Sequence, residues 1–378
     1  MEPAEVKTPA VMRTPRKVDI DLTSRCNLRC RYCYFFDNSS VTYQDLITAE
    51  WLQFFDELGR CAVMDVTLAG GEPFTRPDLR QLLEGIVRNR MRFALLSNGT
   101  LIDDEIAAYL ADTGCCNYVQ VSIDGSSPEA HDACRGKGAF ERALRGLRTL
   151  QRHGVQVAVR VTIHRYNVHD LEATAQFLLE ELELPAFSTN SAGYLGSCRV
   201  NAEAVLLTTA ERLVAMESLV RLTQKYDERI SATAGPLAEA RMWRRMEEAR
   251  SAGAPQFPIG GRLTACGCPG SKIAVRADGT IIPCNMLAHI ELGRINQDSL
   301  AEVWQHSPEL NKLRTRSSIP LTEFEFCSGC GYLPYCTGNC PALAYTLIGQ
   351  VNHPSPDACL RRFLEEGGTL ETIWTTPT

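Results

Sequence analysis

The sequence has no segment that is apolar and long enough to cross a membrane or to act as a secretion signal. Its first 17 residues, MEPAEVKTPAVMRTPRK, carry charges and prolines where a signal peptide has an apolar core. An excess of positive charge is also missing, since 39 Lys and Arg residues stand against 45 Asp and Glu. These absences predict a cytoplasmic protein that binds neither a membrane nor nucleic acid.

The sequence also lacks the composition of a small disulfide-stabilised protein. With 378 residues, of which 44% are hydrophobic, it can bury a large core without cross-links. Its 16 cysteines are clustered, and in a reducing cytosol such clusters are metal ligands or catalytic groups before they are disulfides. No internal repeat is found beyond the alternation described next.

Short β-rich runs alternate with amphipathic stretches in the first half of the chain. The runs are VDIDLT (18–23), VMDVTLAG (63–70), RFALLSNG (92–99), YVQVSIDG (118–125), VQVAVRVTI (155–163) and AFSTNSAG (186–193). Near-continuous apolar strands separated by helices predict parallel strands covered by helices. Six such units predict an α/β fold, a partial (β/α)6 TIM barrel that is open on one side, with its chemistry at the C-terminal ends of the strands.

The sequence divides into five parts on composition. A flexible N-terminal arm (1–17) precedes the barrel (18–200), and a helical bridge with a Gly/Pro-rich linker (201–261) follows it. Cysteine density then rises, which predicts a small second domain (262–365) before a C-terminal tail (366–378).

Three cysteines, Cys26, Cys30 and Cys33, lie in one loop directly after the first strand, with the spacing C-x3-C-x2-C. A structural zinc site takes four ligands, whereas three thiolates on a 4Fe–4S cluster leave one iron able to bind a bidentate small molecule. The amino group and carboxylate of S-adenosylmethionine (SAM) form such a chelate. With GGEP (70–73) after the second strand, this segment resembles the signature of the radical SAM superfamily.

That resemblance implies a mechanism and a set of cofactor-binding residues. Superfamily members reduce the cluster, cleave SAM to a 5′-deoxyadenosyl radical and abstract hydrogen from a substrate. By the resemblance, Gly70, Gly71 and Glu72 hold the methionine end of SAM. The further matching positions are Ser122 for the ribose, Arg160 for the SAM carboxylate, Tyr32 and the backbone near Leu195 for the adenine, and Asn98.

Some polar residues at the strand ends have a plain structural explanation as well. Asn98 and Asp124 each precede glycine, and Asn-Gly and Asp-Gly are ordinary turn dipeptides. His131, Asp132 and Arg135 in HDACRG resemble a common segment of the superfamily, and helix capping explains them nearly as well. Both explanations stay open for these residues.

The C-terminal cysteines resemble the seven-cysteine SPASM domain, which carries two auxiliary 4Fe–4S clusters beside a radical SAM barrel. By this resemblance Cys268, Cys284 and Cys340 hold auxiliary cluster I, and Cys327, Cys330, Cys336 and Cys359 hold auxiliary cluster II. The two resemblances together imply three 4Fe–4S clusters and bound SAM. Cluster I lacks an obvious fourth ligand, and Cys266 is the candidate because the intervening Gly267 can adopt the unusual backbone that the spacing needs. An open iron is the alternative.

Five further cysteines match no motif. Buried free cysteine behaves as a small hydrophobic residue, and this role is expected for Cys61, Cys115, Cys116, Cys134 and Cys198.

Enzymes with these two domains mostly modify peptides, and the segments DLTSRCNLRCRYCYFF and ELGRCAVMDVTLAGGEPF resemble maturases of peptide-modification cassettes, such as the SynChlorMet type. The resemblance thus favours a maturase that cross-links or oxidises a ribosomally made precursor peptide. The implied partners are that peptide, a separate leader-peptide-binding protein and an electron donor such as ferredoxin or flavodoxin. Two alternatives are a radical SAM enzyme acting on a haem or other tetrapyrrole precursor, and a non-enzymatic zinc protein. No catalytic base is assignable from the sequence.

Overall fold

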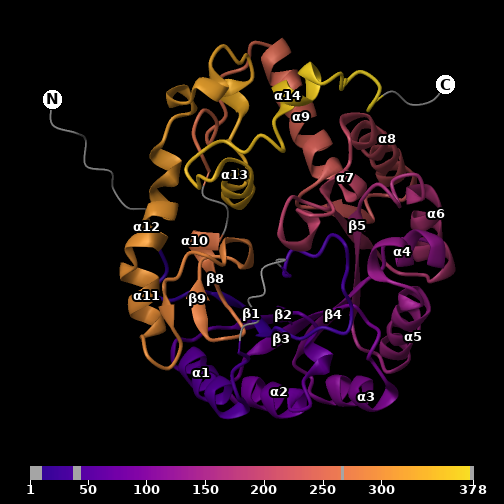
Figure 1. Ribbon diagram of the computed structural model, residues 1–378, viewed down its shortest axis with the longest axis vertical. Helices are drawn as coiled ribbons and strands as arrows, with labels where there is room; N and C mark the ends of the chain where they lie inside the picture. The colour runs from indigo at the N-terminus through magenta and orange to yellow at the C-terminus, as the bar shows by residue number, and fades with distance from the viewer. Residues whose placement is uncertain (1–10, 37–43, 265–267, 375–378) are drawn as a thin grey trace.

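The computed structural model describes residues 11–36, 44–264 and 268–374, and its strands form one curved, open sheet (Figure 1). The spatial order is β10-β9-β8-β1-β2-β3-β4-β5-β6-β7. The barrel strands, all parallel to their neighbours, are β1 (Lys17–Thr23), β2 (Asp65–Gly70), β3 (Arg92–Ser97), β4 (Cys116–Ser122), β5 (Val157–Ile163), β6 (Phe187–Ser191) and β7 (Ile230–Ala232). β7 and β10 are edges that do not pair with each other, which confirms the predicted open barrel.

Helices cover the outside of this sheet, as Figure 1 shows. They are α1 (Thr48–Arg60), α2 (Leu79–Arg88), α3 (Asp104–Asp112), α4 (Pro128–Arg135), α5 (Ala139–Arg152), α6 (Leu171–Gln176), α8 (Thr209–Lys225) and α9 (Pro236–Ser251). The short α7 (Ala202–Val205) instead packs near the cysteine loop, where Val205 belongs to the same small apolar cluster as Cys198. In α1, for example, Trp51, Phe54 and Phe55 are fully buried. Burying each of these side chains contributes about 1.5–3 kcal/mol.

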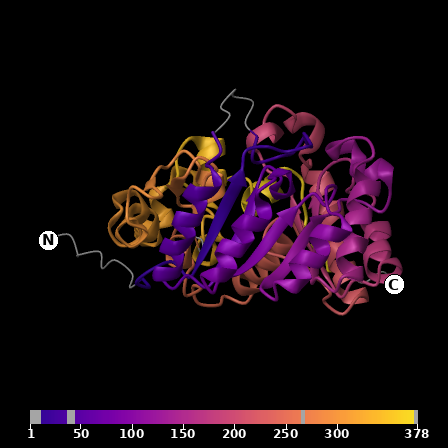
Figure 2. The same ribbon diagram turned by 90° about the horizontal axis from the view of Figure 1, so that it is seen from below.

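The side chains of β1 alternate between the hydrophobic core and the barrel interior. Val18, Ile20 and Leu22 are fully buried and belong to the core beneath the helices. Successive side chains of a strand point to opposite faces, so Asp19 and Asp21 point to the interior. The interior is therefore lined by polar groups, and the strands run obliquely across the molecule toward one rim (Figure 2).

The bridge after the sixth strand differs from the expectation of two helices alone. α8 and α9 form, but the segment between them adds β7 to the edge of the sheet, where Phe187 of β6 pairs with Ile230. A strand of three residues is too short to produce a recognisable alternation, so the sequence pattern missed it.

The cysteine-rich segment is continuous with the barrel sheet. It contains α10 (Cys268–Ser271), β8 (Lys272–Val275), β9 (Thr280–Ile282), β10 (Gly293–Arg294), α11 (Leu300–His306), α12 (Pro308–Thr315), α13 (Pro341–Ile348) and α14 (Leu360–Glu365). β8 lies parallel to β1, with Lys17 opposite Lys272. The predicted second domain therefore extends the first sheet, which brings its cysteines to the open side of the barrel.

The Gly/Pro-rich linker is packed rather than loose. The amide of Phe257 donates to the Pro334 carbonyl at 3.2 Å, and the amide of Gly261 donates to the Cys336 carbonyl at 2.9 Å. These bonds fix the linker against the segment that carries Cys336. In the described part of the chain, no helix has the length and apolarity needed to cross a membrane.

Candidate active site and iron–sulfur centres

The loop with Cys26, Cys30 and Cys33 lies against the end of β2 through backbone contacts. The amide of Gly71 donates to the Thr23 carbonyl, and that of Glu72 donates to the Arg25 carbonyl, both at 2.8 Å. A Cβ atom at Gly70 would overlap the Thr23 carbonyl oxygen, and one at Gly71 would overlap the Arg25 carbonyl oxygen. The lack of a side chain at both glycines thus lets the end of β2 pack closely against the cysteine loop, in addition to any approach of a ligand.

Glu72 is almost completely buried, and its carboxylate joins β2 to β3. It accepts from the Ser97 hydroxyl at 2.9 Å and from the Asn98 amide at 2.7 Å. Burial raises the pKa of Glu72 to about 7 despite these donors. The contact with the SAM amino group stays a prediction, and the structure adds a positioning role that the motif alone did not indicate.

Asn98 reaches from the end of β3 to the cysteine loop. Its side-chain amide donates to the Asn27 side chain at 2.9 Å and lies 3.9 Å from the Cys26 sulfur. Its Oδ1 accepts from the Thr100 amide at 2.9 Å, so the turn explanation also holds. The Asn98 side chain therefore both contacts the cysteine loop and closes the turn after β3.

Ser122 and Arg160 lie opposite each other on β4 and β5. Arg160 Nε donates to the Ser188 hydroxyl at 3.3 Å. Alternation with the buried Val159 and Val161 places Arg160 on the interior face. Its assignment to the SAM carboxylate stays a prediction.

Tyr32, expected beside the adenine, has a set of buried partners. Its hydroxyl donates to the Asp124 carboxylate, and its ring stacks on His164 with centroids 5.3 Å apart. The guanidinium of Arg135 lies 5.4 Å from the ring centroid and forms an ion pair with Asp124 at 2.5 Å. Asp124 is therefore more than a turn residue, since it ties the cysteine loop to α4.

The capping explanation applies to Asp132 in the same segment. Its carboxylate accepts from the amides of Gly138 and Phe140, at 2.5 and 2.8 Å, just before and within the first turn of α5. His131 instead accepts from the Asp124 amide through Nδ1 at 3.1 Å. HDACRG thus contains one cap and two members of the buried network.

The loop after β6 lies against Cys33, the third cysteine of the cysteine loop. The Ser197 amide donates to the Cys33 carbonyl at 2.9 Å. Gly196 has a φ of +51°, and a Cβ there would overlap the Cys33 and Tyr34 carbonyl oxygens. Leu195, predicted to flank the adenine, immediately precedes this contact.

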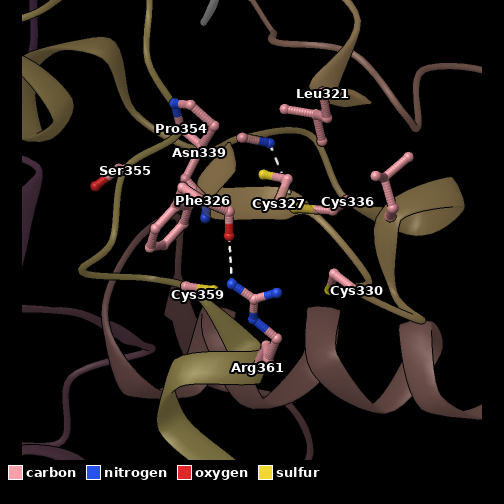
Figure 3. A pocket seen from close by; sticks show the side chains of 12 residues that line it. Leu321, Phe326, Cys327, Cys330, Cys336, Asn339, Pro354, Ser355, Cys359 and Arg361 are labelled. Atoms are coloured by element: carbon pink, nitrogen blue, oxygen red, sulfur yellow. Dashed lines mark hydrogen bonds between the residues drawn. The ribbon is translucent and has the colours of Figure 1, made fainter. Parts of the chain in front are cut away.

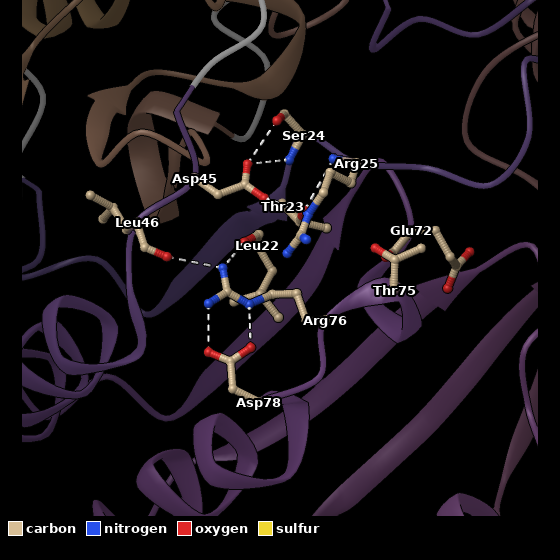
Figure 4. A network of polar contacts seen from close by, with 10 residues as sticks. All are labelled: Leu22, Thr23, Ser24, Arg25, Asp45, Leu46, Glu72, Thr75, Arg76 and Asp78. Carbon is tan, nitrogen blue, oxygen red and sulfur yellow. Dashed lines mark hydrogen bonds and ion pairs between the residues drawn. The ribbon is translucent and has the colours of Figure 1, made fainter.

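Two residues that the sequence did not single out hold the start of the cysteine loop (Figure 4). One is Asp45, whose carboxylate accepts from the Ser24 amide at 2.7 Å and from the Thr23 hydroxyl, and pairs with Arg25 at 3.4 Å. These contacts come from a segment about 20 positions further along the chain. No local pattern marks such a residue.

The other is Arg76, which follows the GGEP motif. It donates to the Leu22 and Leu46 carbonyls at 3.0 and 3.1 Å and pairs with Asp78 at 2.6 Å. Arg76 therefore fixes the end of β1 relative to β2, one turn beyond Glu72.

Asp21 is a further residue that the sequence analysis missed. It is nearly fully buried on the interior face of β1, and its Oδ1 has no hydrogen-bond partner among the described residues. Burial raises the pKa of Asp21 to about 7. Asp19, two residues earlier, pairs with Lys272 of β8 at 2.6 Å.

Four cysteines assigned to auxiliary cluster II surround one cavity (Figure 3). The walls of this cavity include Cys327, Cys330, Cys336 and Cys359. Burial raises the pKa of the Cys327 thiol to about 12 and that of Cys336 to about 11. Bound iron reverses this effect, because a coordinated thiol is deprotonated by the metal charge. The donor set therefore fits an iron–sulfur cluster.

Three cysteines assigned to auxiliary cluster I line a second cavity. They are Cys268, Cys284 and Cys340. Cys266, the candidate fourth ligand, lies outside the described residues. Three converging thiols fit a cluster as well.

The described residues contain no group of three or more His, Cys, Asp or Glu side chains spaced to hold a single metal ion.

The unassigned cysteines differ in burial. Cys134 and Cys198 are buried together in a small apolar cluster, as expected for hydrophobic residues. Cys61, Cys115 and Cys116 are only half-buried.

Comparison with known proteins identifies the superfamily. The Radical SAM superfamily profile matches residues 20–178, and the profile of the SPASM iron–sulfur cluster-binding domain matches residues 266–331. Fe-coproporphyrin III synthase of Methanosarcina barkeri (strain Fusaro / DSM 804) is 30% identical over 368 residues, which cover 93% of this chain and 89% of the relative. The chain belongs to the radical SAM superfamily. This radical SAM enzyme uses SAM and iron–sulfur clusters, so the alternative of a non-enzymatic zinc protein is wrong.

One more relative and two solved structures are also similar to this radical SAM enzyme. AdoMet-dependent heme synthase of the same organism is 28% identical, over 92% of this chain and 97% of its own. Among solved structures, Streptococcus suis SuiB bound to its precursor peptide SuiA has a TM-score of 0.68 at 15% identity, covering 93% of this chain and 77% of SuiB. Native anSMEcpe with bound AdoMet has a TM-score of 0.68 at 18% identity, covering 93% of this chain and 96% of its own. At these identities the two structures show the shared fold alone.

Proposed function

We propose that this radical SAM enzyme acts on an iron tetrapyrrole with carboxylate side chains, a precursor or derivative of haem. The observation that carries the proposal is the 30% identity to Fe-coproporphyrin III synthase over 93% of the chain, which spans both the barrel and the cysteine-rich domain. The AdoMet-dependent heme synthase supports the same substrate class over a similar span. The comparisons thus favour the tetrapyrrole alternative over the peptide maturase that the sequence motifs favoured.

The structural resemblance to SuiB does not favour a peptide. An identity of 15% accompanies a shared barrel, and enzymes with one fold act on unrelated substrates. The substrate class therefore depends on the relatives of higher identity.

The proposed cofactor sites follow the geometry described above. Cys26, Cys30 and Cys33 hold the SAM-binding cluster, and the two cysteine-lined cavities hold the auxiliary clusters, which gives three 4Fe–4S clusters. When bound and reduced, the first cluster supplies the electron that cleaves SAM. Asn98 and Tyr32 position the loop that carries its ligands, while Glu72 fixes the end of β3. The electron itself comes from a one-electron donor such as ferredoxin or flavodoxin.

The barrel interior offers charges for a substrate with carboxylate arms. Arg160 points to the interior from β5, and Lys272 points to it from β8, where it pairs with Asp19. Guanidinium and ammonium groups are the natural partners of carboxylates. Since Arg160 is assigned above to the SAM carboxylate, Lys272 is the candidate partner for a substrate carboxylate. A substrate carboxylate can replace Asp19 beside Lys272.

The test is a comparison of substrates with purified anaerobic enzyme. Enzyme, SAM and dithionite are mixed with Fe-coproporphyrin III, with other carboxylated iron tetrapyrroles, or with a precursor peptide encoded near the gene. Production of 5′-deoxyadenosine, the mass of the tetrapyrrole and the position of its main absorption band are measured. We expect a tetrapyrrole to increase 5′-deoxyadenosine formation and to be converted to a product of different mass.

A variant with Cys26, Cys30 and Cys33 all changed to Ala is the matched control. It should still perturb the tetrapyrrole spectrum but form no 5′-deoxyadenosine. Labelling of the peptide without any conversion or spectral change of the tetrapyrroles would overturn the proposal in favour of a peptide maturase.

A further inference from the structure

Two aromatic rings stack face to face beside the cavity assigned to auxiliary cluster I. The imidazole of His289 lies on the phenol ring of Tyr345, with ring centroids 3.7 Å apart and ring planes 12° from parallel. His289 follows Cys284 by five residues, and Tyr345 follows Cys340 by the same number. The stacked pair therefore joins two of the segments that line this cavity.

The imidazole of His289 is exposed and available to a ligand. No described residue forms a hydrogen bond with either of its ring nitrogens. The atoms that cover part of the ring lower the pKa of His289, so the imidazole is neutral at neutral pH. A neutral imidazole is the form that binds a transition metal. One histidine is a weak site for a free metal ion, but it is a common single protein ligand of haem iron, whose equatorial ligands come from the macrocycle.

Exposed apolar side chains flank the two rings along the chain. Met286 lies three residues before His289, and Leu347 and Ile348 end α13, the helix that carries Tyr345. Single exposed apolar residues are ordinary, whereas three in two segments joined by a ring stack offer contact area to a flat apolar ligand.

The segment from Cys284 to His289 borders the barrel interior. Asn285 lies beside the carboxyl of Asp21 on the interior face of β1. The helix α13 borders the barrel as well, since Leu343 lies 3.5 Å from the position that a Cβ of Gly193 would take, on the loop after β6. Figure 1 accordingly shows α13 inside the ring formed by α12 and the barrel helices.

A cation lies close to the same segment. Burial alone would lower the pKa of Lys272, but charges on Asp19 and on cysteines that include Cys284 raise it above its usual value. Lys272 is the candidate partner for a substrate carboxylate. An ammonium group for a carboxylate arm, an imidazole for an iron and apolar side chains for a macrocycle are thus found near Cys284.

We propose that His289 is an axial ligand of the iron in the tetrapyrrole substrate, with Tyr345 fixing the orientation of its imidazole. This inference rests on the substrate class proposed above. It places the macrocycle beside auxiliary cluster I. The ligand contact requires iron, so a metal-free macrocycle lacks this contact and keeps the others.

The experiment uses the reconstituted full-length enzyme without SAM, under argon, with Fe-coproporphyrin III as the probe. Resonance Raman spectra of the ferrous complex report the iron–histidine stretching band, and absorption titrations give the dissociation constant. Metal-free coproporphyrin III is titrated in parallel by fluorescence. His289→Ala and Tyr345→Phe are compared with wild type, and His306→Ala is the matched control, because His306 is an exposed histidine at the end of α11.

Wild type, His306→Ala and Tyr345→Phe should show the iron–histidine band, since the phenylalanine ring keeps the stack. His289→Ala should lose the band, and free imidazole should restore it. The dissociation constant of the iron complex should rise in His289→Ala by roughly ten-fold or more, since loss of even a hydrogen-bond partner of a metal ligand typically costs that much. The affinity for the metal-free macrocycle should stay near that of wild type.

Two results overturn the inference. One is an iron–histidine band in His289→Ala that equals that of wild type, because another residue is then the ligand. The other is an equal loss of affinity for the iron complex and the metal-free macrocycle, because His289 then contacts only the ring.

Failure of the proposed function gives a different result. A wild-type enzyme that converts a tetrapyrrole but shows no iron–histidine band removes this inference alone. A wild-type enzyme that neither binds nor converts any tetrapyrrole removes the proposed function, and this inference with it.

Discussion

The Tyr32 hydroxyl donates a hydrogen bond to the Asp124 carboxylate, which connects the loop with Cys26, Cys30 and Cys33 to a buried ion pair at the end of β4. Asp124 is completely buried, and Arg135 is nearly so. The Thr162 amide on β5 also donates to Asp124, at 2.9 Å. One carboxylate therefore sets the relative positions of two strands, one helix and the segment between Cys30 and Cys33.

Changing Asp124 to Asn should destabilise the enzyme strongly. Breaking a buried ion pair by removing one partner costs about 3–5 kcal/mol, because Arg135 is left as a buried charge. The free energy of unfolding in urea, measured anaerobically on the reconstituted enzyme, should fall by that amount. Glu129→Gln on the exposed face of the same helix is the control and should change it by less than about 0.5 kcal/mol. Equal stability of Asp124→Asn and wild type would show that the ion pair is not holding this region.

The contact between β2 and the cysteine loop gives a second prediction. In Gly71→Ala the new Cβ overlaps the Arg25 carbonyl oxygen, one residue before Cys26, so the loop must shift. We expect the variant to lose the SAM-binding cluster, about 4 irons per chain, while the auxiliary clusters remain. Gly270→Ala is the control, because a Cβ there meets no atom within 4 Å. A full iron content in Gly71→Ala, together with normal SAM cleavage, would contradict the packing argument.

The parts of the site that follow local sequence were predictable, and the parts that depend on distant contacts were not. The cysteine spacings and GGEP lie within single turns, and the strand alternation around Val18 and Ile20 is a local pattern. Asp45 contacts the start of the cysteine loop from another segment, and Arg76 contacts the end of β1 from beyond the GGEP motif. Such roles arise from packing between segments that no spacing records.

Variants at Glu72 and Ser97 distinguish binding of SAM by Glu72 from its positioning of β3. Charge-assisted hydrogen bonds contribute about 1.5–3 kcal/mol each, so Glu72→Ala should raise the dissociation constant of SAM by roughly ten- to hundred-fold. Ser97→Ala removes one donor to the same carboxylate at 2.9 Å and leaves the charge in place, so it should have a much smaller effect. Isothermal titration with the reconstituted enzyme measures both. Equal effects of the two variants would mean that Glu72 acts only by positioning β3.

Asp21 should make stability depend on pH near neutrality. Burial raises its pKa from 3.8 to about 7, so the folded state holds the proton more tightly than the unfolded chain does. Stability is then lost as pH rises through the interval between these values. Between about pH 6 and about pH 8.5 the pH passes the folded pKa of Asp21. Over this range the contribution of Asp21 to the free energy of unfolding falls by about 1.4 kcal/mol, the equivalent of one pKa unit. Asp21→Asn should remove this slope in urea unfolding, whereas Asp19→Asn, which breaks the pair with Lys272, should keep it. An unchanged slope in Asp21→Asn would assign the dependence to another group.

Cys266 decides whether auxiliary cluster I has an open iron. Three thiols, those of Cys268, Cys284 and Cys340, line its cavity, whereas four line the other. Gly267 allows the backbone turn through which two cysteines one residue apart reach one cluster, so we expect Cys266 to be the fourth ligand. Cys266→Ala should keep an iron content near that of wild type, because three thiolates suffice to hold a cluster, but it should alter the paramagnetic resonance spectrum of cluster I. Cys268→Ala should also keep the cluster if Cys266 is a ligand, because three thiolates remain, and should lose it if Cys266 is not. If the spectrum of Cys266→Ala matches that of wild type and Cys268→Ala loses the cluster, then Cys266 is not a ligand, and cluster I either has an open iron or is ligated from elsewhere.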